Sequence, residues 1–158
     1  MTNDTTLRGT PFSAAEAVKK GTIELSLTMQ GRQLVFTMKS IAGDNLLKVV
    51  DGQNFLAIYE KTIAQFVLNA STDWSLDGKA GIIEFKDPLD WQFYSLTHNP
   101  SETPLRSFTL HARPTGKPQS DPQDHPFNLF VLLPQPDGVP PLPITIDPGI
   151  KNPPPGGN

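Results

Sequence analysis

The stretch TIELSLTMQGRQLVFTMKS, residues 22–40, decides the fold class of this chain. Apolar residues alternate with polar ones in each of its two halves, and a polar Gln-Gly-Arg segment separates the halves. Alternation with period two is typical of a β-strand that has one buried face and one face in water. The stretch therefore predicts a β-hairpin. The inward positions are Ile23, Leu25, Leu27, Met29, Leu34, Phe36 and Met38.

Strand patterns recur along the rest of the chain. The segment 107–113 alternates fully, and 127–133 is almost entirely apolar, which is typical of a central strand. Asp77-Gly78, between Trp74 and Ile82, predicts a second hairpin. Of the 17 prolines, 15 lie from Pro100 onward, at expected strand ends and loops, where a missing N–H is harmless. Further strands are expected over 46–50, 63–69, 89–96 and 142–147.

These patterns predict an all-β fold, a two-sheet antiparallel β-sandwich of immunoglobulin-like or jelly-roll type. Ser13 and Glu16 have capping-box spacing, so a short N-terminal helix is expected over residues 14–20. Residues 1–148 are expected to form one domain, and 149–158 a proline- and glycine-rich tail. The predicted core comprises Ile23, Leu25, Leu27, Phe36, Phe108, Leu110, Phe127, Leu129, Val131 and Ile144.

Composition excludes several classes of function. The net charge is −3 and no basic run exceeds Lys19-Lys20, which argues against nucleic-acid binding. Cysteine is absent, which excludes disulfides and thiolate catalysis. With no basic and apolar leader and no membrane-spanning apolar run, a cytoplasmic protein without membrane contact is expected. A homo-oligomer is expected, with residues 142–153 at the contact, because a polyproline segment loses little entropy on docking.

The segment PITIDPGIKNP, residues 143–153, resembles the ending of a small family of bacterial proteins called the DP-EP family. The resemblance rests on Asp147-Pro148 and Lys151-Asn152-Pro153, with the overall length and the preceding proline-rich loops. It implies a compact β-sandwich from a bacterial cytoplasm with no established activity. Similar sequences are also described as nucleotide synthetases, but the residues do not support that activity. Both common phosphate-binding glycine motifs are absent, and Gly78-Lys79-Ala80-Gly81 is typical of a hairpin turn.

The residues with catalytic potential form no recognisable constellation. His98, His111 and His125 show no paired metal-ligand spacing, and His111 falls on the polar face of its strand with Ser107, Thr109 and Arg113. They are expected to be solvated or hydrogen-bonded surface histidines. Asp residues that precede proline are expected to shape turns. No catalytic residue, metal site or cofactor is therefore predicted, and a metal-dependent enzyme with a histidine centre is an alternative that the spacing disfavours.

Aromatic side chains give the best indication of a binding surface. Tyr59, Trp74 and Tyr94 are the candidates for an exposed patch, because Trp and Tyr rings stack on sugars or fill partner pockets. Packing in the core or beside a hairpin is the alternative for the same residues. The sequence thus favours a non-catalytic protein that acts by binding or self-association, with a carbohydrate or small-ligand binding module as the alternative.

Overall fold

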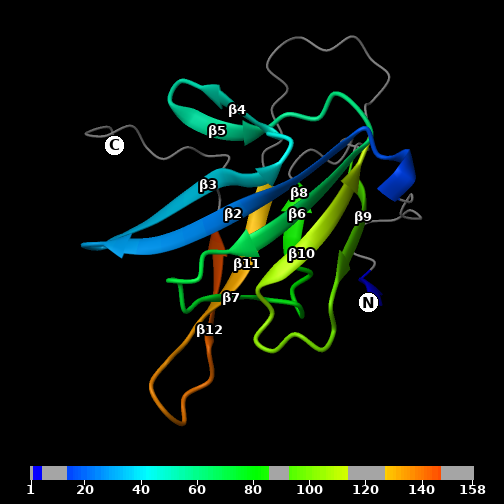
Figure 1. The fold of residues 1–158 in the computed structure, drawn as a ribbon. Coiled ribbons are helices and arrows are strands. Elements are labelled where there is room, and N and C mark those ends of the chain that lie inside the picture. Colours follow the sequence, from blue (N-terminus) through cyan, green and yellow to red (C-terminus); the bar gives the residue numbers. More distant parts are fainter. Residues whose placement is uncertain (1, 5–13, 86–92, 114–126, 147–158) are drawn as a thin grey trace.

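The computed structural model describes residues 2–4, 14–85, 93–113 and 127–146, and it is built from β-strands (Figure 1). The strands form a six-stranded sheet, a smaller sheet around one central strand, and a separate two-stranded hairpin. In chain order they are β1 (Thr2–Asp4), β2 (Lys19–Gln30), β3 (Gln33–Gly43), β4 (Leu47–Val50), β5 (Gln53–Leu56), β6 (Thr62–Leu68), β7 (Ser75–Leu76), β8 (Ile83–Phe85), β9 (Phe93–His98), β10 (Ser107–Ala112), β11 (Phe127–Leu133) and β12 (Leu142–Ile146).

The large sheet has the strand order β1-β9-β10-β6-β2-β3. The predicted hairpin over residues 22–40 is confirmed as the long β2–β3 pair, which reaches out to the left in Figure 1. Gly31 takes a φ of 63° in its two-residue turn, a conformation that glycine adopts without steric cost. β2 and β6 run parallel, whereas the other pairs of this sheet are antiparallel. The expectation of strictly antiparallel sheets is therefore wrong.

The smaller sheet is built around β11, the central strand predicted from its apolar run. β12 pairs with one side of β11, and β7 and β8 pair with the other. The second predicted hairpin is wrong, because β7 and β8 both pair with β11 and not with each other. Residues 77–82 form a loop, here called the 77–82 loop, that connects β7 and β8 on the same side of β11. At its two ends, Asp77 N donates to the carbonyl of Phe130, and Phe130 N donates to the carbonyl of Ile82.

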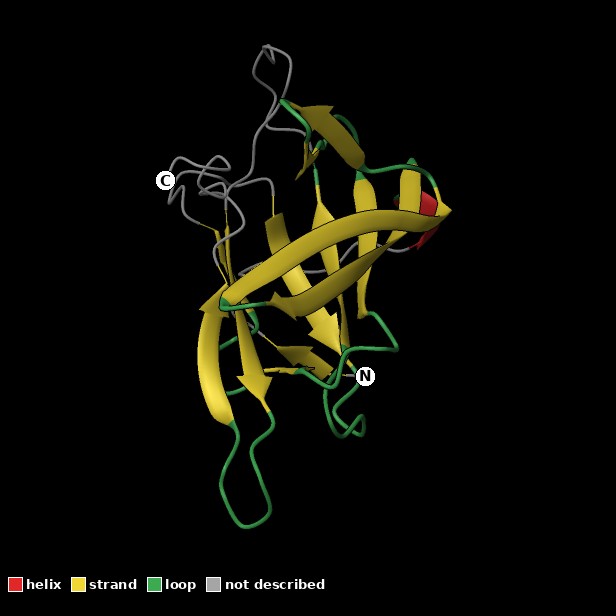
Figure 2. Ribbon diagram, turned by 90° about the vertical axis from the view of Figure 1, so that its left-hand side faces the viewer, coloured by secondary structure: helices red, strands yellow, loops and turns green. Residues whose placement is uncertain are grey.

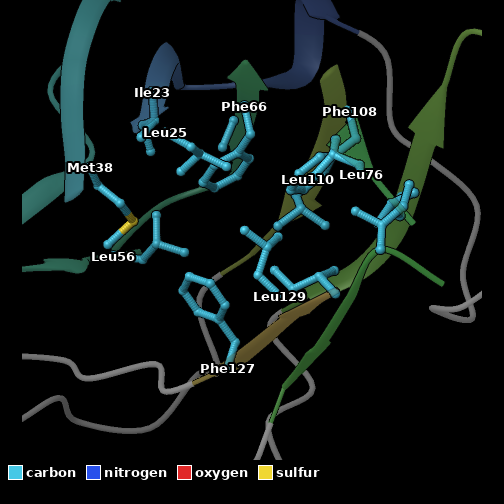
Figure 3. Close-up of a cluster of buried hydrophobic side chains, with 14 of the residues drawn as sticks. Ile23, Leu25, Met38, Leu56, Phe66, Leu76, Phe108, Leu110, Phe127 and Leu129 are labelled. Carbon is cyan, nitrogen blue, oxygen red and sulfur yellow. The ribbon is translucent and has the colours of Figure 1, made fainter. Parts of the chain in front are cut away.

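One hydrophobic core takes its side chains from both sheets (Figure 3). Phe66 and Phe108 stack with ring centroids 4.8 Å apart in the large sheet, and Leu129 faces them from β11. Most of the predicted core is confirmed, since Ile23, Leu25, Leu27, Phe108, Leu110, Phe127, Leu129 and Val131 are buried. Phe36 and Ile144 are partly buried and pack against this cluster.

The predicted helix over residues 14–20 is wrong beyond its first turn. A 3₁₀ turn spans Ala14–Glu16, the only helical segment among the described residues (red in Figure 2). The backbone amides of Val18 and Lys19 both donate to the carbonyl of Lys61, at 2.9 and 3.1 Å. Pairing with the start of β6 therefore replaces helix formation, which is unfavourable for so short a segment.

Candidate functional site

A group of buried polar side chains lies on the outer face of the large sheet. Leu96 and Leu110 point into the core, so their neighbours Ser95, Thr97 and His111 point to the opposite face. These three polar residues are nevertheless only 2%, 6% and 7% exposed, respectively. Because polar residues on an outer face are ordinarily solvated, this group, here called the His111 group, is the strongest candidate site among the described residues.

Strand register brings the members of the His111 group together. His111 on β10 pairs with Ser95 on β9, and Thr109 pairs with Thr97 one row further along. Directly opposed residues have Cβ atoms about 4.5–5.5 Å apart, and neighbours on one strand face lie two residues apart. The imidazole and three hydroxyl-bearing side chains thus share one small area of the sheet.

A polar row extends from this group across the sheet. Thr109 is in register with Gln65 on β6, and Gln65 with Thr22 on β2. The Thr22 hydroxyl lies 3.4 Å from Oε1 of Gln65 and donates to it. Hydroxyl and amide groups in a row offer both donors and acceptors to a polar ligand laid across the strands.

Burial changes the acid–base character of His111. Desolvation lowers the pKa of its imidazole below the ordinary value of 6.5, because burial disfavours the charged form. At neutral pH the side chain is therefore a neutral imidazole, which can accept a proton at one nitrogen and donate from the other. Next to the hydroxyl of Ser95, such a group is suited to proton transfer.

Positive charge lies at the same end of the sheet, where β10 ends and β2 and β6 begin (upper right in Figure 1). Lys20 is in register with Ile63, and Ile63 with His111, so Lys20 shares the row of His111. Arg113 follows β10 directly and is exposed. The carboxylate of Asp44 accepts the backbone N–H of Lys20 at 2.9 Å, which places one negative group beside this lysine.

The predicted aromatic patch lies at three separate places in the fold. Trp74, just before β7, is 5% exposed and belongs to the core, so its expected exposure is wrong and the packing alternative is confirmed for it. Tyr59 lies between β5 and β6 and is exposed. Tyr94 is a residue of β9, and its side chain lies outside the described parts. A binding role for these residues stays a prediction.

Backbone amides of the segment Gly78-Lys79-Ala80-Gly81 are bonded within the same turn. Oδ1 of Asp77 accepts the backbone N–H groups of Lys79 and Ala80 at 3.1 and 3.2 Å. These amides are therefore engaged by the protein's own carboxylate and do not form a cradle for a phosphate. The segment is a turn, as predicted, although it does not join two paired strands.

His98 and His111, the two histidines among the described residues, point to opposite faces of their sheet. His111 lies on the polar face, as predicted, but it is buried rather than solvated. His98 ends β9, three residues from Ser95 and with the opposite orientation along the strand. His125 lies outside the described residues. Within residues 2–4, 14–85, 93–113 and 127–146, no three His, Cys, Asp or Glu side chains are grouped to hold a metal ion.

Comparison with known proteins assigns the chain to a family. A family model described as "Predicted novel nucleotide synthetase" matches residues 7–155. The chain belongs to this family. No curated protein matches the chain. No helix in the part of the chain that the structure describes is long and apolar enough to cross a membrane.

Family membership corrects the predicted family and the predicted non-catalytic function. The chain belongs to the predicted nucleotide synthetase family and not to the DP-EP family. A synthetase is an enzyme, so the predicted non-catalytic role in binding or self-association is wrong. Both common phosphate-binding glycine motifs are absent from this chain, but their absence does not indicate a non-catalytic protein. Thr97 was missed, and Ser95 was a nucleophile candidate that the sequence disfavoured because no base is evident beside it; the parity of β9 against Leu96 places both on the face of His111.

Proposed function

We propose that this protein is an enzyme that forms a nucleotide, with its reaction at the His111 group. Membership of the predicted nucleotide synthetase family over residues 7–155 carries the proposal. Transfer of phosphoryl groups depends mainly on positioning and on stabilising negative charge. The His111 group supplies a neutral base and hydroxyl donors, and its end of the sheet supplies cations.

His111 is proposed as the general base. The attacking hydroxyl or amine of the acceptor bonds to the α-phosphorus of a nucleoside triphosphate and gives its proton to the imidazole, and pyrophosphate leaves with the electron pair of the broken P–O bond. The lowered pKa keeps the imidazole in its basic form near neutral pH. Ser95, in register with His111, is placed to orient the acceptor through its hydroxyl.

Lys20 is proposed to hold the phosphates of the substrate. It lies two strands from His111 in the same row, a separation of roughly 10 Å at the usual strand spacing. An exposed ammonium group on a rigid strand attracts phosphate oxygens as a point charge. Arg113 is expected to add a second cation at the same end of the sheet.

The test measures turnover with defined substrates. The purified protein is incubated separately with ATP, GTP, CTP and UTP in the presence of Mg²⁺, so that each triphosphate serves as the donor and its own ribose hydroxyls serve as the acceptor. Products are identified by liquid chromatography and mass spectrometry. We expect conversion of at least one nucleotide. Replacement H111Q should lower kcat by roughly 10²-fold or more, the usual contribution of a general base, and K20A should mainly raise KM.

A matched control is H98Q, which changes the same residue type on the adjacent strand but outside the His111 group. H98Q is expected to keep the activity of the wild type. Two outcomes would overturn the proposal: no nucleotide consumption together with no thermal stabilisation by ATP, or equal activity of H111Q and H98Q. Circular dichroism spectra of all variants exclude unfolding as the cause of a loss.

We also propose that the two sheets form one β-sandwich domain that carries this site. The core shared by both sheets supports this arrangement, although the parallel β2–β6 pair departs from the regular immunoglobulin and jelly-roll patterns. Residues 149–158 lie outside the described part of the chain. The cytoplasmic location and the contact at residues 142–153 stay predictions.

A further inference from the structure

The open edges of the two sheets differ in how they are protected. An unpaired strand edge presents N–H and C=O groups that pair with other chains, and proteins block such edges with proline, charge, bulges or short strands. β12 carries Pro143 on its five residues. β1 has only three residues, and the edge formed by β7 and β8 is interrupted by the 77–82 loop.

β3 is the remaining edge, and it is 11 residues long. Its second half is protected in three ways. Nδ2 of Asn54, from the β4–β5 hairpin, donates to the carbonyl of Met38 at 2.9 Å. Lys39 adds a charge, and the register with β2 shifts at Ile41, which marks a bulge. Each of these features disfavours the addition of another strand.

The first half of β3, residues 33–37, has none of these features. Its sequence is Gln-Leu-Val-Phe-Thr, without charge or proline, and its register with β2 is regular. Among the described residues no strand pairs with its outer edge. Within the two sheets, as far as the structure describes them, this segment is therefore the one regular stretch of edge that is open to a partner strand.

The same part of the hairpin carries apolar surface beyond the core. Leu34 and Phe36 are only half-buried, and Met29, in register with Leu34, is 56% exposed. All three lie on the face that is buried further along the sheet. The tip of the β2–β3 hairpin thus projects beyond the core, so the core-facing side chains near this tip are left partly uncovered. Figure 1 shows this projection.

We propose that residues 33–37 of β3 pair antiparallel with the same residues of a second copy of this chain. A twofold axis at Val35 places Gln33 opposite the partner's Thr37 and Leu34 opposite the partner's Phe36. The half-buried apolar residues of both copies then form one continuous strip. Such self-complementary pairing is the isologous contact that a twofold dimer requires.

The charges around this segment favour the second copy as the occupant. With the axis at Val35, Lys39 faces the partner's Gly31 and Arg32 faces the partner's Met38, so no like charges lie directly opposite. Lys39 is already in register with Glu24 on β2 of its own chain. Opposed like charges would destabilise a strand pair, and this register avoids them.

The first test traps the dimer covalently. The chain has no cysteine, so V35C introduces a single thiol in each copy. On the proposed twofold axis the two substituted residues face each other, and the Cα atoms of directly opposed antiparallel residues lie about 4.5–5.5 Å apart, within the range of a disulfide. T28C is the control, because Thr28 is in register with Val35 on β2. Its distance from its copy spans three strand spacings, roughly 14 Å, which is too long for a disulfide.

Mild oxidation should convert V35C to a covalent dimer of twice 17.3 kDa on a non-reducing gel and leave T28C monomeric. Light scattering should give the dimer mass for wild type and T28K and the mass of a single chain for V35K, with unchanged circular dichroism. Equal cross-linking of V35C and T28C, or a V35K protein that stays dimeric, would overturn the proposal. A monomeric wild type would also overturn it and would leave this edge to an extended segment of another protein.

Discussion

The guanidinium of Arg106 donates from Nη1 to the carbonyl of Trp74 at 2.6 Å. Its Nη2 donates to the carbonyl of Asn69 at 2.7 Å, so one side chain holds both ends of the loop between β6 and β7. The backbone N–H of Arg106 is in turn held by Oε1 of Glu102 at 3.0 Å. Because Arg106 directly precedes β10, this loop is tied to the sheet that carries His111.

Substitution R106A should destabilise the fold. It removes two charge-assisted hydrogen bonds and leaves two carbonyls to find other donors, for a loss of about 2–3 kcal/mol in the free energy of unfolding. R106K should recover part of the loss, since an ammonium group can reach one carbonyl. Urea unfolding measures the change, and R32A, at the exposed β2–β3 turn, is the control with an expected change below about 0.5 kcal/mol.

Leu110 is a core position at which a cavity is expected to be costly. Its side chain is fully buried between the two sheets, so L110A should lower the free energy of unfolding by about 2–5 kcal/mol through lost burial and the cavity left behind. V139A, at an exposed position, should have little effect. Denaturant unfolding of both variants checks this, and equal midpoints would contradict the assigned register.

Gly21 allows a close approach of two chain segments. A Cβ at this position would meet the carbonyl oxygen of Asp44 and lie 3.1 Å from Cγ of Leu46. G21A should therefore cost about 1–3 kcal/mol, because backbone must shift in a packed region. G78A is the matched control, since its nearest neighbour is Leu105 at 3.5 Å. Similar melting temperatures for the two variants would contradict this account.

The lowered pKa of His111 gives stability a defined pH dependence. The unfolded imidazole binds a proton below about 6.5, whereas the folded one does so only at lower pH. Between these values the unfolded state binds more protons, so stability is full above the unfolded pKa and is lost as the pH falls toward the folded one. Melting curves at pH 7.5 and 5.5 should therefore differ less for H111Q than for the wild type or H98Q.

The sequence by itself determined most of the strands. Period-two alternation placed β2, β3 and β10 and their buried faces, because a one-residue shift would bring every apolar side chain into water. The apolar run at 127–133 likewise identified the central strand β11. These features are local, and one amphipathic face is enough to fix them.

Only the tertiary structure decided which strands meet and what covers their faces. Lys19 and Lys20 lie in a strand because the carbonyl of Lys61, more than 40 positions away, accepts the amides at the start of that strand. The same applies to the burial of Trp74 and of His111, whose environments come from segments distant in the sequence. Long-range pairing and desolvation depend on the whole fold, and no local pattern records them.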